Sequence, residues 1–288
     1  MDNLSTIILA SALIIIMLGM GLGLVKEDFK RIFLSPKAIV IGLANQLILL
    51  PLIGFALVSI FPLQPEIAVG VMLLAACPGG PTSNLISHLA KGDTALSVSL
   101  TAVSSLITII TIPFVVNFAL EHSLDAGHMI QLDPIKVIGQ VLVITVIPIA
   151  IGMIIRNKNE NFANKMAKPV KIGSAIVLAL VIVGIIFKEK ENFVSYFQQA
   201  GLVTLLLNLA TMAVGYLTAK LFLLKKEQAI SISIESGIQN GTLAIFIAVT
   251  LLNNSAYAIA PAVYSLIMFL TGGLVIYFGN KNQDAKKS

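Results

Sequence analysis

A single carboxylate stands in the middle of a long apolar stretch. Glu235 lies within residues 228–252, whereas acidic residues such as Glu66 and Asp93 fall at the ends of such stretches. A carboxylate in apolar surroundings must be protonated or compensated by a cation. Because no Lys or Arg lies at a matching depth, we expect Glu235 to bind a proton or a metal ion.

Oxygen-bearing side chains are grouped near the same depth. Ser97 and Thr101 are four residues apart, so they share one face of a helix. The further side chains of this kind are Gln46, Ser83, Asn84 and Gln239. Hydroxyl, amide and carboxylate oxygens suit a hard cation, and a single carboxylate fits Ca²⁺ poorly. The one cysteine, Cys77, and three scattered histidines form no soft metal site, so Na⁺ is the predicted metal ion.

The composition defines the class of protein that holds these residues. Hydrophobic residues make up 57% of the 288 residues, charged residues make up 11%, and the mean hydropathy is +0.95. A soluble domain carries about 25% charged residues, so the composition predicts a polytopic membrane protein. The net charge of +5 does not indicate a nucleic-acid partner, because the basic residues lie in short loops between apolar stretches.

Nine stretches are long enough to cross the hydrocarbon core as helices of about 20 residues. They cover residues 4–25, 37–60, 67–90, 94–120, 135–155, 170–187, 199–223, 228–252 and 257–279. The ten-residue alternating pattern of a β-barrel does not occur, so the predicted fold class is all-α. The first stretch follows no basic region and carries no small-residue cleavage site, which predicts a retained helix rather than a signal peptide.

Two of the nine stretches are interrupted. Residues 77–84 read CPGGPTSN, and residues 235–242 read ESGIQNGT. Pro and Gly do not continue a helix, and broken backbone at membrane depth is tolerated only inside protein or beside a water-filled cavity. Interrupted helices of opposite direction, one in each half of the chain, are typical of secondary transporters with an inverted repeat. Kinked helices with structural prolines are the alternative interpretation.

The basic residues indicate the orientation in the membrane. With the N-terminus outside, 16 of the 19 basic residues fall in cytoplasmic segments, as the positive-inside rule requires. These residues are Lys26, Lys30, Arg31, Lys37, Lys91, Arg156, Lys158, Lys165, Lys168, Lys171, Lys220, Lys225, Lys226, Lys281, Lys286 and Lys287. The external segments then hold Lys136, Lys188 and Lys190. We expect a multi-pass protein of the cell inner (plasma) membrane with a cytoplasmic C-terminus.

The first interruption offers both ends of a helix dipole. Pro81 and Thr82 have the features of a helix start, with proline in the first turn and capping residues beside it. Such a start attracts an anion. The half-helix that ends near Cys77 leaves carbonyl groups free, and these attract a cation. One junction can therefore hold a cation and an anion side by side.

Around these residues the sequence resembles the bile acid:sodium symporter family. The resemblance rests on EIAVG (66–70) before CPGG (77–80) and Ser83-Asn84, on Gly92 with ALSV (95–98) and Thr101, on IESGIQN (234–240), and on GMGL (19–22) with Asp28-Phe29. The match covers nearly the whole chain in order. Its motifs are long enough to be specific for that family.

The resemblance implies a single transmembrane domain, residues 1–288, with two crossing broken helices. A truncated first repeat would cover residues 1–121, and a second repeat would cover 135–279. The panel helices would lie at about 4–25 and 135–187, and the core helices at about 37–120 and 199–279. Bacterial members often have ten helices, and this chain corresponds to a member without the first one.

The resemblance also implies two sodium sites. The first would use Ser83, Asn84, Ser97, Thr101 and Glu235. The second would use the side chains of Gln46, Glu235 and Gln239 with the backbone carbonyls of Ser236 and Ile238. All of these side chains are present. The chain departs from the family at Pro81, after the paired glycines, and at Met268-Phe269-Leu270, where some relatives place polar residues near the substrate.

The predicted function is sodium-coupled import of an organic anion by alternating access. Thr82, Asn240 and Gly241 would face the substrate carboxylate. The substrate would be bile-acid-like or a smaller carboxylate such as pantoate or a keto acid, which non-animal relatives carry. The expected partners are this anion, two Na⁺ ions and the lipid bilayer, with no nucleic acid and no obligate protein partner.

Three other functions are the alternatives to sodium-coupled import. A proton-coupled carrier would use Glu235 as its proton site. An intramembrane enzyme is disfavoured because the sequence offers no convincing pair of nucleophile and base and no histidine cluster. A passive channel would not concentrate its substrate, so uptake against a gradient would exclude it.

Overall fold

The computed structural model describes residues 3–124, 132–191 and 193–284, and within these ranges the regular structure is helical apart from one isolated β-bridge. The helices long and apolar enough to cross a membrane are Pro36–Ile60, Thr94–Ser123, Pro134–Lys158, Val194–Leu221 and Ala256–Lys281. Shorter apolar helices cover Ile7–Gly21, Pro65–Ala76, Ile176–Phe187 and Gly241–Leu251. The predicted all-α polytopic class is confirmed. Two of the shorter apolar helices, Pro65–Ala76 and Gly241–Leu251, lie next to the breaks in the chain.

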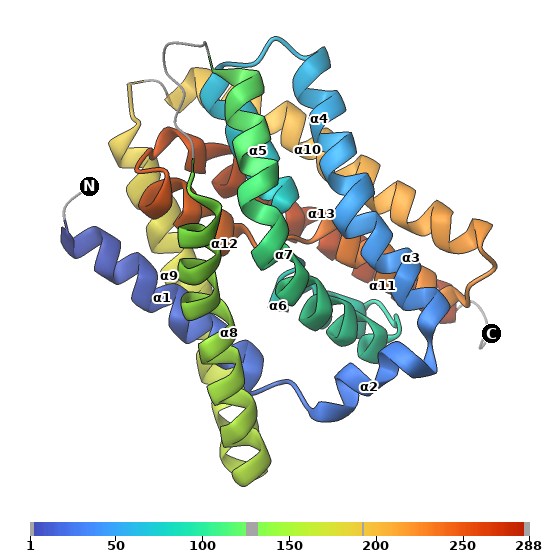
Figure 1. Cartoon of the computed structure of the whole chain (residues 1–288). Coiled ribbons are helices and arrows are strands. Elements are labelled where there is room, and N and C mark those ends of the chain that lie inside the picture. Colours follow the sequence, from blue (N-terminus) through green and yellow to red (C-terminus); the bar gives the residue numbers. More distant parts are fainter. Residues whose placement is uncertain (1–2, 125–131, 192, 285–288) are drawn as a thin grey trace.

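Three helices pack together at one side of the molecule (Figure 1). They are α1 (Asn3–Gly21), α8 (Pro134–Lys158) and α9 (Glu160–Lys188). Glycine permits the close crossing of α1 and α8. A Cβ on Gly21 would stand 2.1 Å from the carbonyl oxygen of Ile149, and a Cβ on Gly152 would stand 2.4 Å from that of Leu18. Small residues at membrane helix crossings allow this close backbone approach.

The remaining helices form the larger part of the molecule. They are α2 (Lys26–Leu34), α3 (Pro36–Ala44), η1 (Asn45–Leu49), α4 (Leu50–Ile60), α5 (Pro65–Ala76), α6 (Pro81–Leu89), α7 (Thr94–Ser123), α10 (Phe193–Leu221), α11 (Lys226–Gly237), α12 (Gly241–Phe246), η2 (Ile247–Leu251), η3 (Ala256–Ala258) and α13 (Ile259–Asp284). Helices α3, η1 and α4 run on as one helix, and α10 packs on α11 and α13. The proposed panel and core domains and the repeat boundaries stay predictions.

Two broken helices cross at their breaks. Helix α5 gives way to α6 around Gly79, and α11 gives way to α12 around Gln239. An antiparallel β-bridge joins these two residues. The N–H of Asn240 donates to the carbonyl of Pro78 at 2.9 Å, and the N–H of Gly80 donates to that of Ile238 at 3.3 Å. Each break thus supplies hydrogen-bond partners for the other, which accounts for interrupted backbone inside a membrane protein.

Helix α2 is an element that the apolar pattern did not predict. It is a short amphipathic helix between α1 and α3. The buried Asp28 accepts a hydrogen bond from the N–H of Val25 at 2.8 Å, and its backbone carbonyl accepts one from the hydroxyl of Ser99 at 2.7 Å. These bonds attach α2 to α7 and fix the direction in which the chain leaves α1.

Three segments that carry basic residues of the predicted cytoplasmic set lie toward one side of the molecule. Figure 1 shows α2, the C-terminal end of α8 and the C-terminal end of α13 toward the same side. The cytoplasmic set of the predicted orientation includes Lys286 and Lys287, which lie outside the described residues. The protein is a multi-pass membrane protein by its helices. The direction in which it crosses the membrane stays a prediction.

Candidate functional site

Glu235 is fully buried near the end of α11, where three hydroxyl groups converge on its carboxylate. The hydroxyls of Ser83 and Ser97 each donate to Oε1 at 2.5 Å. The hydroxyl of Thr101 lies 2.9 Å from both carboxylate oxygens. Ser83 comes from α6, whereas Ser97 and Thr101 come from adjacent turns of α7. The structure therefore brings together residues that the sequence places in three separate stretches.

Asn84 completes the predicted first ion site. Its Oδ1 lies 2.9 Å from the hydroxyl of Ser97 and 3.1 Å from that of Thr101. The hydroxyl of Ser83 also contacts the carbonyl of Gly80 at 2.7 Å, and that of Thr101 contacts the carbonyl of Ser97 at 3.1 Å.

The hydroxyl groups around Glu235 have fewer hydrogens to donate than there are acceptor oxygens within hydrogen-bond distance of them. Three hydroxyls carry one hydrogen each, yet they face both oxygens of Glu235, the Oδ1 of Asn84 and two backbone carbonyls. Oxygen atoms that approach each other without a hydrogen between them repel, and an added cation or proton removes the repulsion. This set of oxygen ligands therefore fits a hard cation such as Na⁺.

Two glutamine amides lie on the other side of Glu235. The Nε2 of Gln46 donates to the backbone carbonyl of Glu235 at 2.9 Å and to Oε2 at 3.0 Å. The Nε2 of Gln239 donates to the carbonyls of Glu235 and Ser236 at 3.1 and 2.9 Å. The carbonyl of Ile238, the remaining predicted ligand, accepts the 3.3 Å bond from Gly80. All members of the predicted second ion site thus lie together.

These amides leave their own oxygens unsatisfied. The Oε1 atoms of Gln46 and Gln239 are buried and have no hydrogen-bond partner. Buried acceptors are normally paired. A cation at the carbonyls of Glu235 and Ser236 would replace the amide nitrogens there, and rotation of each amide would offer its Oε1 as a ligand. The second set therefore also fits a hard cation.

A turn of π-helix places Gln46. Residues Asn45–Leu49 form it, and the N–H of Leu50 reaches back to the carbonyl of Asn45. Asn45 also donates through Nδ2 to Thr218 on α10 at 2.9 Å. Such turns are frequent at functional sites. The signal in the sequence is Pro51, which lacks a backbone N–H and disturbs the helix just before it.

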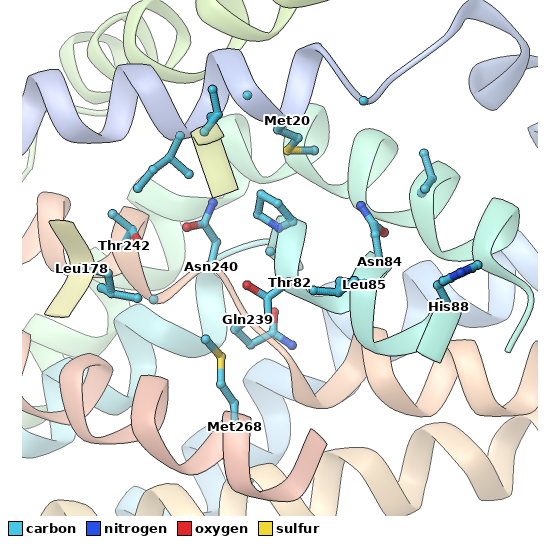
Figure 2. A pocket seen from close by; sticks show the side chains of 18 of the residues that line it. Met20, Thr82, Asn84, Leu85, His88, Leu178, Gln239, Asn240, Thr242 and Met268 are labelled. Carbon is cyan, nitrogen blue, oxygen red and sulfur yellow. The ribbon is translucent and has the colours of Figure 1, made fainter. Parts of the chain in front are cut away.

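A cavity of about 430 Å³ lies beside the polar side chains around Glu235, which we call the ion cluster for its predicted role. The cavity is bounded by α1 and α9 on one side and by the broken helices on the other (Figure 2). Its lining residues are Ile16, Gly19, Met20, Gly23, Leu24, Gly80, Pro81, Thr82, Asn84, Leu85, His88, Thr94, Val98, Val170, Leu178, Gln239, Asn240, Gly241, Thr242, Met268 and Phe269. The three predicted substrate residues, Thr82, Asn240 and Gly241, are all among them. Asn84 and Gln239 belong both to the cavity wall and to the ion cluster.

Asn240 is placed to donate into this cavity. It is the N-cap of α12, and its Oδ1 accepts from the N–H of Leu243 at 3.0 Å. This bond uses the amide oxygen and leaves the Nδ2 donors for the cavity, toward which Figure 2 shows the side chain directed. Gly241 follows, and a Cβ there would stand 2.0 Å from the Oγ of Ser265. Only glycine fits between α12 and α13.

Some polar residues on the face of Thr101 stay outside the site. Ser104, Ser105 and Thr108 donate to carbonyls within α7 itself, so their role is local. His88 lines the cavity, and its Nδ1 lies 3.4 Å from the hydroxyl of Thr94. Among the residues described, no three His, Cys, Asp or Glu side chains gather as a metal site.

Sequence reasoning missed two residues beside the second break. Asn208 on α10 and Tyr264 on α13 are both fully buried. They donate to the carbonyl of Gly237 at 2.6 and 2.7 Å. Nothing in their local spacing marked them, because each lies in an otherwise apolar stretch and meets the break only through packing.

Comparison with known proteins covers nearly the whole chain. The model of the Sodium Bile acid symporter family matches residues 10–196. The uncharacterized sodium-dependent transporter YocS of Bacillus subtilis is 31% identical over 278 residues, which are 95% of this chain and 83% of that protein. The human ileal sodium/bile acid cotransporter is 28% identical over 247 residues, which are 84% of this chain and 70% of that protein.

A plant relative gives a similar match. The probable sodium/metabolite cotransporter BASS2, chloroplastic, of rice is 27% identical over 271 residues, which are 94% of this chain and 63% of that protein. The family and these relatives are transporters rather than enzymes. The resemblance seen in the sequence is confirmed, and the chain belongs to the sodium bile acid symporter family.

Proposed function

We propose that this protein is a sodium-coupled symporter that imports an organic anion across the cytoplasmic membrane by alternating access. The observation that carries the proposal is that the oxygen cluster around Glu235 adjoins the cavity lined by Asn240. An oxygen cluster suited to Na⁺ surrounds Glu235, and the cavity that adjoins it is lined by the amide of Asn240 and the first turn of α6. The names of the relatives, which include sodium, support the choice of ion.

Two Na⁺ ions would share Glu235. One would bind the oxygens of Ser83, Asn84, Ser97 and Thr101. The other would bind Gln46 and Gln239 after their amides rotate, with the carbonyls of Ser236 and Ile238. Two Na⁺, the carboxylate of Glu235 and a monoanionic substrate sum to zero charge. Leaving out one ion would leave a charge uncompensated in a poorly solvated interior, which is costly. This charge balance is the physical reason for coupled transport.

Asn84 and Gln239 provide the structural link between ion and substrate. Each contributes to the ion cluster and to the cavity wall. An ion that fixes these two amides also fixes the surface that the anion meets. The binding of one species therefore lowers the ordering cost of binding the other.

The direction of transport follows from the proposed orientation. The cavity runs from the crossover along α6 to His88 and Thr94, on either side of the segment that holds Lys91 of the predicted cytoplasmic set. Figure 2 shows His88 at the far end of this row from Asn240. With the N-terminus outside, that end is cytoplasmic, so the structure corresponds to a state that faces inward. Import would require a second state in which α1, α8 and α9 close this side.

A thermal-shift screen of small organic anions, each with and without Na⁺, tests the proposal. We expect Na⁺ alone to raise the unfolding temperature and at least one carboxylate to raise it further only when Na⁺ is present. Choline and K⁺ serve as controls at equal ionic strength. Stabilisation by an anion that is independent of Na⁺, with uptake driven by a pH gradient, would favour the alternative in which Glu235 carries a proton.

A further inference from the structure

The carbonyl group of Gly237 receives two side-chain donors from two different helices. Asn208 on α10 donates through Nδ2 at 2.6 Å, and Tyr264 on α13 donates through its hydroxyl at 2.7 Å. Both side chains are fully buried. Neither is a member of the proposed sodium sites, and neither lines the cavity described above. The mechanism proposed so far therefore gives them no role.

The last carbonyl groups of α11 have two kinds of hydrogen-bond partner. The last carbonyls of a helix have no partner within the helix. Those of Glu235 and Ser236 are met by the glutamine amides, which belong to the second proposed ion site. That of Gly237 is met only by residues outside the site. A cation could replace the glutamine amides at the carbonyls of Glu235 and Ser236. The carbonyl of Gly237, in contrast, keeps its two donors, Asn208 and Tyr264, when a cation binds.

Holding the carbonyl of Gly237 also directs the next one. Ile238 has extended dihedral angles, φ −117° and ψ 94°. Successive groups of an extended chain point to opposite sides. When the carbonyl of Gly237 is fixed toward α10 and α13, the carbonyl of Ile238 is turned the other way, toward α6, where it accepts from the N–H of Gly80.

We propose that Asn208 and Tyr264 are positioning residues for the second sodium site. They hold the carbonyl of Gly237 away from the ion and thereby aim the carbonyl of Ile238 at it. This inference rests on the proposed function, because it assumes that the second site binds Na⁺. It adds two residues that act through the backbone and never touch the ion.

The packing around the break supports a specific role. A Cβ on Gly237 would stand 2.0 Å from the Cγ of Met212, so the backbone lies tightly against α10. The next residue of α13, Ser265, lies against Gly241 at the start of α12. Adjacent residues of α13 thus contact both sides of the break. The Oδ1 of Asn208 has no hydrogen-bond partner, so a buried asparagine here is unfavourable unless its donor is needed.

Tyr264→Phe removes one hydroxyl and leaves the ring in place. We expect the Na⁺ concentration for half-maximal thermal stabilisation to rise about three- to tenfold, the effect of one lost hydrogen bond. Tyr257→Phe is the control, because Tyr257 is also buried, at 2% exposure, but lies on η3 away from the break. A purely structural role would lower the unfolding temperature in K⁺ and leave the Na⁺ dependence unchanged.

Combined variants assign the effect to one of the two ion sites. In a Gln239→Ala background, Tyr264→Phe should add little, because the second site is already impaired. In a Ser97→Ala background, which leaves the ligands of the second site in place, Tyr264→Phe should still raise the half-maximal Na⁺ concentration. Asn208→Ala removes the donor from the other helix and should reproduce the shift of Tyr264→Phe, so it also provides the readout if that variant does not fold.

The possible failures are distinct. A wild-type protein whose unfolding temperature does not respond to Na⁺ overturns both the proposed function and this inference. A wild-type protein that responds, with the same half-maximal Na⁺ concentration in Tyr264→Phe and Asn208→Ala, overturns only the positioning role. If Tyr264→Phe had its full effect in the Gln239→Ala background as well, the positioning role would also be overturned.

Discussion

The backbone of Gly79 lies against the carboxylate of Glu235, so that a Cβ added to Gly79 would stand 2.5 Å from Oε2. The same Cβ would stand 2.9 Å from the Nε2 of Gln46. The break in the first crossing helix therefore forms one wall around the carboxylate that the second crossing helix supplies. The backbone angles of Gly79 are not in the left-handed region, so the position does not need the conformational freedom of glycine. Glycine is required here because a Cβ would have too little space.

Gly79→Ala should impair the ion cluster from this wall. Overpacking a tightly packed interior costs about 1–3 kcal/mol. We expect a lower unfolding temperature and a loss of most Na⁺-dependent stabilisation, because the methyl group displaces the carboxylate. Gly139→Ala on α8 is the control, since a Cβ there has no neighbour within 4 Å. Equal Na⁺ responses in the two variants would contradict the proposed location of the ions.

Glu235→Gln tests the charge that both proposed sites share. The amide keeps the size of the side chain, so folding should survive. The lost neutralisation in a poorly solvated site should weaken Na⁺ affinity at least tenfold, which corresponds to about 1.4 kcal/mol. Sodium-dependent uptake should nearly vanish.

The measurement for Glu235→Gln is Na⁺-dependent thermal stabilisation together with uptake in Na⁺ and in choline buffer. A proton-coupled carrier would respond differently, since glutamine mimics the protonated acid and often preserves substrate exchange. Unchanged Na⁺ stabilisation in a folded variant would remove Glu235 from the ion site.

Asn240→Ser should separate anion binding from helix capping. Serine keeps an oxygen that can cap α12, but it removes the amide donors that line the cavity. Hydrogen bonds to a charged group contribute about 1.5–3 kcal/mol, so we expect anion affinity to fall tenfold or more at saturating Na⁺. Na⁺ affinity in the absence of anion should change less than about twofold. The matched control is Asn254→Ser, because the Oδ1 of Asn254 likewise accepts a backbone N–H, that of Ala256 in η3, and Asn254 does not line the cavity. A loss of Na⁺ binding with intact anion binding would reverse the assigned roles.

Cysteine labelling tests the orientation. In a Cys77→Ser background, a cysteine at Ser123 should react with an impermeant reagent added outside intact cells. A cysteine at Asn157 should react only after the membrane is opened. Ser123 ends α7 and Asn157 lies at the end of α8, and these two consecutive helices cross the membrane in opposite directions in the predicted topology. The reverse pattern of labelling would show that the N-terminus is cytoplasmic.

The local features of this protein could be predicted from the sequence. Apolar length predicts the membrane helices, and Pro and Gly predict both breaks, because these residues act on the backbone at their own position. The pair Ser97 and Thr101 could be placed on one face from helical periodicity alone. Glu235 stood out because a carboxylate at that depth needs a partner. The proposed roles of these residues in Na⁺ binding stay predictions.

The tertiary structure decided which of these residues meet. Ser83 and Glu235 are separated by 152 residues in sequence, and they touch only because the two broken helices cross. The same crossing requires glycine at position 79 and brings Asn208 and Tyr264 to the carbonyl of Gly237. Local periodicity carries no information about such contacts, because they depend on how helices distant in sequence pack against each other. For that reason the sequence indicated the proposed oxygen ligands, while the residues that we propose to position them were found only in the folded protein.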